Sequence, residues 1–174
     1  MKFSKILLLL VIAISIVSCK SDDDAPGAFI LSNGNLAGTH DLTYFTSNLV
    51  ITGDVGGQTI TVTTNTVADT YQVEVVFTEA GTYTIDGEFR TTTTSSLGTP
   101  PQVEIVVVNE TGTYQVNAAA QTIVFIQTGS TLGDSDINTV TLFNETDLRV
   151  TYEDTYTVDG DEISEMTELR FVKQ

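Results

Sequence analysis

Several residue types that carry chemistry or cross-links are scarce in this chain of 174 residues. It contains one cysteine, one histidine, three prolines and no tryptophan. A single cysteine excludes a disulfide within the chain, so stability must come from the core and from backbone hydrogen bonds. A single histidine restricts nucleophilic catalysis, because a serine or cysteine triad would need His40 as its base, and no Gly-x-Ser-x-Gly motif is present.

Basic residues are scarce as well. Seven Lys and Arg residues stand against 23 Asp and Glu residues, which gives a formal net charge of −16. Lys2 and Lys5 precede residue 19, so the chain from Cys19 onward keeps five basic residues and a formal charge of −18. Such a chain repels nucleic-acid phosphates, and we expect no nucleic-acid partner. The acidic residues are spread along the sequence, which is typical of a solvated surface.

The longest apolar run is Ile6–Val17, which follows Lys2 and Lys5 and ends before Ser18. It is shorter than the ~20 residues that a membrane-spanning helix needs. A short basic start, an apolar stretch and a small residue predict a secretory signal over residues 1–18. No second hydrophobic segment of this kind follows, so we expect one domain beyond it.

Ile16-Val17-Ser18-Cys19 closely resembles the bacterial lipobox. The resemblance implies cleavage before Cys19 and acylation of its thiol, which makes a membrane the first partner. An ordinary cleaved signal with an incidental cysteine is the alternative. Residues 19–35 are expected to be an acidic, flexible tether, and Lys20-Ser21-Asp22-Asp23-Asp24 resembles the signal that sends lipoproteins to the outer face of the outer membrane. We therefore expect an outer-membrane anchor that displays the domain on the cell surface, with the periplasmic face as the alternative.

Beyond the tether, β-branched and aromatic residues with period-2 alternation predict an all-β domain over residues 36–174. Four similar strand starts support it: Thr70-Tyr71-Gln72-Val73, Thr82-Tyr83-Thr84-Ile85, Thr113-Tyr114-Gln115-Val116 and Thr155-Tyr156-Thr157-Val158. We expect about 8–10 strands, drawn at residues 39–46, 58–66, 69–78, 82–93, 102–109, 112–118, 121–128, 138–144, 147–158 and 162–173.

The expected connections are short, with a type I′ turn at Asp159-Gly160 and a connection at Glu110-Thr111. Longer loops are expected at Thr94–Pro101 and Gly129–Ile137. Antiparallel neighbours joined by tight turns favour an up-and-down β-barrel, which removes sheet edges. A β-sandwich is the alternative, although it usually needs longer crossovers.

Leu36-Ala37-Gly38-Thr39-His40-Asp41-Leu42 resembles the opening of bacterial lipocalin-like lipoproteins, Leu-x-Gly-Thr-Trp-x-Leu. Gly81-Thr82-Tyr83, Gly112-Thr113-Tyr114 and a hairpin formed by Leu148–Tyr152 and Glu168–Lys173 extend the similarity to about residues 36–173. The resemblance implies a barrel with a cup for an apolar ligand. It departs at His40, where the family often has a Trp that plugs one barrel end, and we expect His40 to pack there.

No enzyme activity and no cofactor are expected. Paired acids of the glycosidase type are not excluded by spacing, but Glu74 and Glu104 should face outward. Gly133–Asn138 begins like a calcium loop, with Asp134, Asp136 and Asn138 as weak ligand candidates. It lacks the glycine that such a loop needs, so a solvated loop explains it equally well and no metal site is assigned.

The expected function is binding of a small hydrophobic or amphipathic ligand inside the barrel, because an eight-stranded barrel is just wide enough to hold one. The alternative is a filled core and a surface module that meets a protein or glycan through its loops. The expected ligand-binding residues are Tyr71, Tyr83, Phe89, Tyr114, Phe125, Leu142 and Tyr152. Eight further residues should share this inward face: Val73, Val75, Phe77, Ile85, Val116, Ile123, Leu148 and Val150.

Overall fold

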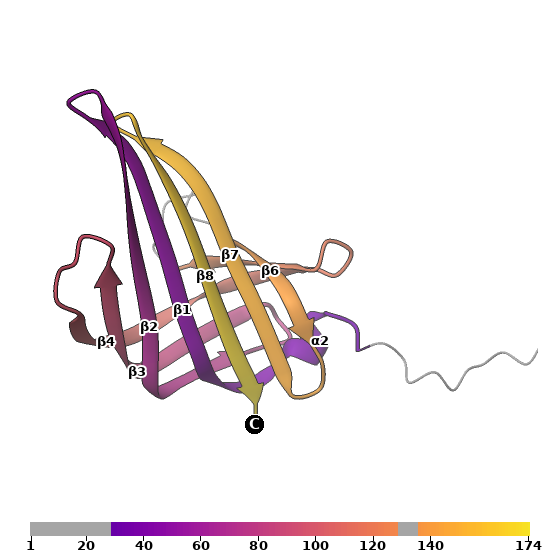
Figure 1. Ribbon diagram of the computed structural model, residues 1–174. Helices are drawn as coiled ribbons and strands as arrows, with labels where there is room; N and C mark the ends of the chain where they lie inside the picture. The colour runs from indigo at the N-terminus through magenta and orange to yellow at the C-terminus, as the bar shows by residue number, and fades with distance from the viewer. Residues whose placement is uncertain (1–28, 129–135) are drawn as a thin grey trace, which may run out of the picture.

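The computed structural model describes residues 29–128 and 136–174. Over these residues the chain forms one short helix and eight long strands (Figure 1). The elements in chain order are α2 (Asn33–Leu36), β1 (Gly38–Val55), β2 (Gln58–Phe77), β3 (Thr82–Ser95), β4 (Gln102–Asn117), β5 (Thr122–Gln127), β6 (Asp136–Phe143), β7 (Asp147–Val158) and β8 (Asp161–Lys173).

The strands form a single closed barrel in sequence order, and every neighbouring pair is antiparallel. Pairing of β1 with β8, from His40 opposite Lys173 to Thr52 opposite Glu162, closes the ring. The predicted up-and-down barrel is therefore confirmed, and the two packed sheets of the alternative sandwich are absent from the described residues. Eight strands fall at the lower end of the predicted range.

Two expected interruptions do not exist. Residues 58–66 and 69–77 belong to the single strand β2, and residues 102–109 and 112–117 belong to β4. The predicted strand ends at residues 78 and 118 lie just outside these elements. Thr70 in β2 has a φ of 57°, and the pairing of β2 with β3 shifts register between Asp69 and Gln72. The strand therefore continues through this irregular position. In β4 the expected connection Glu110-Thr111 is ordinary strand paired with β3.

The tight turns agree with the sequence. Asp159 and Gly160 have φ values of 52° and 97°, and Gly56 and Gly57 have values of 64° and 82°. Positive φ at both central residues is what a type I′ hairpin requires, because its twist matches that of the flanking strands. The longer loop after β3 is shorter than expected, since β3 continues to Ser95 and β4 begins at Gln102.

The core lies inside the barrel and follows the period-2 alternation of the strands. Most of the residues expected to face inward are buried or pack against the core. Leu142 and Tyr152 are the exceptions: Leu142 is 39% exposed, and Tyr152 is half-buried and lies outside the core cluster. The pairing of β6 with β7 shifts register between Val140 and Leu142, so the residues after Val140 turn the opposite face inward, and the inward prediction for Leu142 is wrong.

Residues 29–37 cover one end of the barrel, which we call the closed end. Leu31 and Leu36 are 2% and 0% exposed and belong to the core cluster. The Ser32 hydroxyl accepts a hydrogen bond from the Asn35 amide and caps α2, and Lys173 Nζ donates to the Asn35 carbonyl at 2.9 Å. The chain thus packs on the barrel before residue 36, the expected end of the tether.

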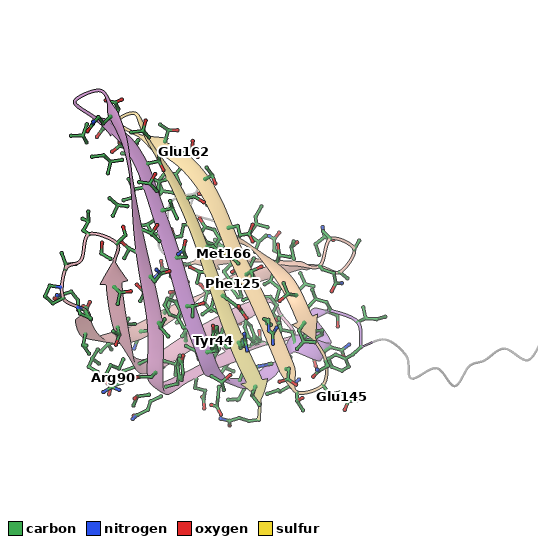
Figure 2. The ribbon with its side chains drawn as sticks, viewed as in Figure 1. Tyr44, Arg90, Phe125, Glu145, Glu162 and Met166 are labelled. Carbon is green, nitrogen blue, oxygen red and sulfur yellow. The ribbon has the colours of Figure 1, made fainter. Side chains whose placement is uncertain are left out.

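At the other end, four neighbouring strands run beyond the barrel body (Figure 1). The pairing of β3 with β2 ends at Thr64, and that of β6 with β7 ends at Tyr152, whereas the β1–β2 and β7–β8 hairpins continue to their turns. Figure 2 places Glu162 near the tip of this extension and Met166 further down. We call it the four-stranded extension. None of the helices in the described residues is both long and apolar enough to cross a membrane.

Candidate functional site

An apolar cavity of about 300 Å³ lies inside the barrel. All eight strands contribute to its wall, because their inward positions converge on one space. Twelve of the lining side chains are apolar and three are polar. The apolar residues are Leu42, Phe45, Val73, Val75, Phe77, Ile85, Phe89, Val108, Phe125, Val150, Leu169 and Phe171, and the polar ones are Tyr83, Glu110 and Asn138.

Two of the polar groups are hydrogen-bonded to each other. The Tyr83 hydroxyl donates to Glu110 Oε1 at 2.5 Å, and the Tyr83 ring is 2% exposed. Tyr83 lies opposite Gly112 in the β3–β4 register, and a Cβ at Gly112 would come within 2.7 Å of the Tyr83 ring. The glycine therefore lets the ring lie across the β4 backbone and reach the carboxylate two residues away.

Phe125 fixes the other side of the same ring. Its ring packs edge-on against Tyr83, with 5.3 Å between centroids and an interplanar angle of 81°. This geometry is favoured between aromatic rings because the positive edge of one meets the negative face of the other. Tyr83, Glu110 and Phe125 thus form an ordered corner of the cavity, which the missing side chain of Gly112 makes possible.

Of the seven residues predicted to bind ligand, Tyr83, Phe89 and Phe125 line the cavity. Tyr114 is buried beside it, donates its hydroxyl to the Thr78 carbonyl at 2.6 Å, and packs edge-on against Phe77. Burial raises the pKa of the Tyr114 phenol, so it stays a hydrogen-bond donor at neutral pH. Its position is that of a core residue that supports the cavity wall.

Tyr71 belongs to the wall between β1 and β2. Its hydroxyl donates to the Ala68 carbonyl at 2.7 Å and accepts from the Phe45 amide at 3.0 Å, where the ladder between these strands is interrupted. Burial is the main cause that raises the pKa of Tyr71. The side chain thus replaces backbone pairing that the irregular register leaves open.

The remaining predicted residues lie elsewhere. Leu142 is on the outside, and Tyr152 is half-buried with its hydroxyl 3.3 Å from Asp154 Oδ2. Asn138, offered as a weak calcium ligand, is 5% exposed and lines the cavity instead. Cys19, Asp134 and the side chain of Asp136 lie outside the described residues, and among the side chains that are described no three His, Cys, Asp or Glu residues could hold a metal ion.

Seven residues that line the cavity, two of them polar, were not predicted to face inward: Leu42, Phe45, Val108, Glu110, Asn138, Leu169 and Phe171. Glu110 was placed in a turn, and Asn138 was considered only as a loop ligand. A signal for Glu110 exists, because it has the same parity along β4 as Val108, Gly112 and Tyr114, which all face inward. The signal was hidden because an acid followed by threonine and glycine is also typical of a turn.

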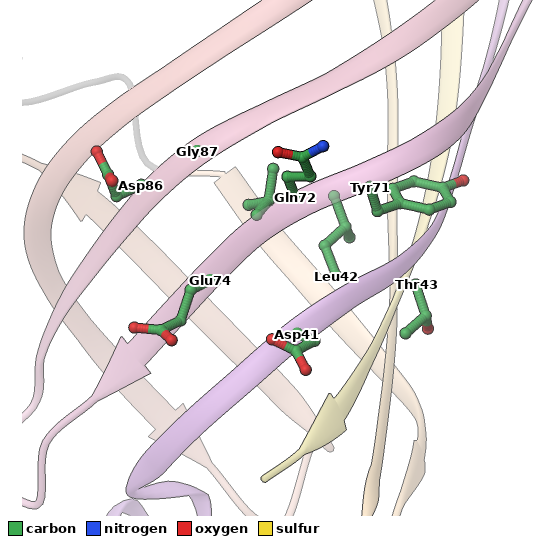
Figure 3. A pocket seen from close by; sticks show the side chains of 9 residues that line it. Asp41, Leu42, Thr43, Tyr71, Gln72, Glu74, Asp86 and Gly87 are labelled. Atoms are coloured by element: carbon green, nitrogen blue, oxygen red, sulfur yellow. The ribbon is translucent and has the colours of Figure 1, made fainter.

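A second hollow lies on the outer surface where β1, β2 and β3 meet (Figure 3). It measures about 650 Å³, and three carboxylates lie across it: Asp41 is opposite Glu74, and Glu74 is opposite Asp86. We call these three residues the acidic row. Leu42 and Val73 line both this hollow and the inner cavity, so the barrel wall is one side chain thick at this point.

His40 is buried at the closed end, as expected. It is 2% exposed, its Nε2 lies 2.9 Å from the Leu36 carbonyl, and its ring meets the edge of Phe77. The carbonyl can only accept, so Nε2 carries the proton, while Nδ1 is buried with no hydrogen-bond partner in the described part of the chain. Burial lowers the pKa of His40, which favours the neutral ring.

The chain was compared with protein-family models, curated proteins and solved structures. No family model matches the chain, and no curated protein or solved structure is significantly similar to it.

Proposed function

We propose that this protein is a lipid-anchored binding protein whose barrel holds one small hydrophobic or amphipathic molecule without transforming it. The observation that carries the proposal is the cavity of about 300 Å³, whose wall is apolar except for Tyr83, Glu110 and Asn138. Small-molecule sites typically combine an apolar lining of 300–1,000 Å³ with a few placed polar groups, and this cavity lies at the small end of that range.

The energetics suit a compact ligand. Each buried methylene contributes ~0.8 kcal/mol, so a chain of six to eight carbons gains roughly 5–6 kcal/mol before the cost of association. Such a gain corresponds to weak binding unless the polar groups of the site add to it. The polar corner at Glu110 therefore matters for affinity as well as for orientation.

The anchor in this proposal comes from the sequence around Cys19. Several acyl chains on one residue hold a domain stably to a bilayer. The Cys19→Ser chain should lose incorporation of a labelled fatty acid and move from the membrane fraction to the soluble fraction. Unchanged membrane association of Cys19→Ser would contradict the anchor and leave the cavity proposal untouched.

The absence of a catalytic step is supported by the position of His40. A general base must reach the proton that it removes. His40 is 2% exposed at the closed end, hydrogen-bonded to Leu36, and does not line either hollow. Its surroundings are those of a packing residue.

The binding proposal is tested by a substitution in the cavity wall that places a larger side chain in the cavity. Val108 lines the cavity, whereas the next residue, Val107, is 71% exposed on the outer face of the same strand. Val108→Phe should abolish the extra mass seen by native mass spectrometry after incubation with bacterial envelope extract, and Val107→Phe should retain it. Val108→Phe should also keep the unfolding free energy within ~1–2 kcal/mol, because its ring enters an existing space.

Two results would contradict the proposal. Equal ligand uptake by both variants would place the ligand outside the cavity. A bare protein mass for the unmodified chain across repeated extracts would favour a binding function on the surface.

One observation favours the alternative, a surface module that binds another protein. Within the described residues, the pairing of β4 with β5 begins at Gly112, and the first half of β4 pairs with β3 alone. Its outer face carries Val103, Ile105 and Val107, which are 64%, 55% and 71% exposed. An exposed edge with apolar side chains can accept a strand from a partner. Ile105→Lys would weaken such an interaction and leave small-molecule uptake unchanged.

A further inference from the structure

We infer that the cavity selects ligands with a cationic head, such as a primary alkylammonium, and that the Glu110 carboxylate binds this head. The inference rests on the proposed function and names the class of ligand for the same site. Among the described residues that line the cavity, Glu110 has the only charged side chain, and the other polar groups are Asn138 and Tyr83, which is bonded to Glu110. A ligand with a cationic head would therefore find its counter-ion at this carboxylate.

The geometry leaves the carboxylate able to accept further hydrogen bonds. Glu110 Oε1 accepts one from the Tyr83 hydroxyl at 2.5 Å. An ionised carboxylate has about four lone-pair sites on two oxygens and no donor, whereas an ammonium has three donors and no acceptor. A hydrogen bond between two such charged groups is about twice as strong as a neutral one. The site thus complements a donor with positive charge.

The position of the carboxylate is set before any ligand binds. Gly112 admits the Tyr83 ring over the β4 backbone, Phe125 packs against that ring, and the hydroxyl holds Glu110. A fixed partner loses little side-chain entropy on binding, so more of the interaction appears as affinity. The apolar residues Phe45, Phe89 and Val108 then surround the tail.

The negative net charge of the molecule also favours a cationic ligand. The formal net charge is −16, so the protein attracts cations and repels anions over a distance set by the salt concentration. A fatty acid would bring its carboxylate against the carboxylate of Glu110, and the two like charges would repel each other. An alcohol of the same length meets neither the attraction nor the repulsion and measures the contribution of the tail alone.

The experiment compares hexylamine, hexanol and hexanoate by calorimetry at pH 7 with residues 19–174 carrying Cys19→Ser, so that no acyl chain competes. Every barrel contact described above is made by residues 29–174, and these are retained. We expect hexylamine to bind at least tenfold more tightly than hexanol, and hexanoate to bind most weakly. In Glu110→Gln the amine should fall to the affinity of the alcohol, while the alcohol changes less than twofold.

The matched control is Glu104→Gln. Glu104 is an exposed acid on β4 that does not line the cavity, so its neutralisation changes the net charge equally without touching the lining. It lies opposite the buried Thr91 and shares the inward face of β4, so the prediction that it faces outward is wrong. It should leave the ranking of the three probes unchanged. If Glu110→Gln does not fold, as judged by circular dichroism, the ranking in the unsubstituted cavity decides the question.

The outcomes separate the two proposals. Equal binding of amine and alcohol, or an amine preference that survives Glu110→Gln, overturns the cationic selectivity and leaves the binding function standing. Binding of none of the three probes overturns both. Loss of the amine preference in Glu104→Gln as well would assign it to the overall charge of the protein and overturn the role of Glu110.

Discussion

A single histidine is buried at the closed end, and its environment is far less polar than water. The ring of His40 has one hydrogen bond, from Nε2 to the Leu36 carbonyl, and its Nδ1 is buried with no partner in the described residues. Protonation would place a charge in this site with no carboxylate bonded to it. Burial therefore lowers the pKa of His40 below the value of about 6.5 that it has when unfolded.

This shift predicts a loss of stability on mild acidification. Above pH ~7 His40 is neutral in both the folded and the unfolded chain, so it adds no pH dependence. Below pH ~6.5 the unfolded chain takes up more of this proton than the folded chain, so the unfolding free energy falls as the pH falls, by at most ~1.4 kcal/mol per pH unit. Urea denaturation at pH 7.5, 6.5 and 5.5 measures this slope.

The control for this prediction is His40→Gln, which keeps a donor for the Leu36 carbonyl and does not titrate. Carboxylates such as Asp69, whose pKa is lowered mainly by its hydrogen bond from Arg90, contribute equally to both chains. The difference between the two chains should therefore be constant above pH ~7 and shrink as the pH falls. A constant difference down to pH 5.5 would show that His40 has the same pKa in the folded and the unfolded chain, which would contradict the prediction.

At the scale of the elements, the acidic row is a run of unfavourable cross-strand pairs on the outer face. Asp41 and Glu74 are directly opposite, as are Glu74 and Asp86, although Gln174 Nε2 donates to Asp41 and Asn109 Nδ2 donates to Asp86. Like charges directly opposite each other destabilise a sheet. Glu74 lies at the centre and takes part in both pairs.

Glu74→Lys should consequently stabilise the protein. It turns two like-charge pairs into two opposite-charge pairs, each worth roughly 0.2–1 kcal/mol, so a gain of ~0.5–2 kcal/mol in unfolding free energy is expected. Glu74→Gln should give about half of it. Thermal denaturation at low and at ~1 M salt checks the cause, because screening at the higher concentration should remove most of the gain. An equal gain at both salt concentrations would point to helpful packing of the new side chain.

The strands show which inward-facing residues can be predicted from the sequence and which cannot. Alternation predicts a strand's inward face, and it correctly brings Tyr83, Phe89 and Phe125 to the cavity. It fails where a register shift reverses the faces, as before Leu142, because a shift of one residue moves every later side chain to the opposite face. Such shifts depend on the partner strand, which local sequence does not identify.

Glycine gives a related ambiguity. Gly112 follows an acid and a threonine and therefore resembles a turn residue, yet its role is to admit the Tyr83 ring over β4. Both roles use the missing side chain, and only the register with β3 distinguishes them. The polar corner at Glu110 was hidden for this reason, while the barrel itself, which depends on many strands and turns, was predicted.

At the scale of the molecule, the barrel depends on the segment that covers its closed end. Leu31 is 2% exposed and joins the core, whereas its neighbour Ile30 is 64% exposed. Leu31→Ala should lower the unfolding free energy by ~2–4 kcal/mol, because it removes buried methyl groups and leaves a space. Ile30→Ala should change it by less than ~0.5 kcal/mol. Urea denaturation of the pair decides whether residues 29–37 are part of the folded unit, and equally small effects would show that they are not.

With the proposed lipid on Cys19, the arrangement of the chain ends would orient the protein on a membrane. Residues 29–37 and the C-terminal residues Lys173 and Gln174 meet at the closed end, through hydrogen bonds to Asn35 and Thr39, while the hairpin tips lie at the opposite end (Figure 1). A chain held by lipid at Cys19 spans at most about 35 Å from there to Phe29. The closed end would then face the bilayer and the four-stranded extension would point into the aqueous phase. A ligand that enters opposite the closed end would therefore arrive from solution, and the protein would sample the water beyond the membrane rather than draw molecules out of it.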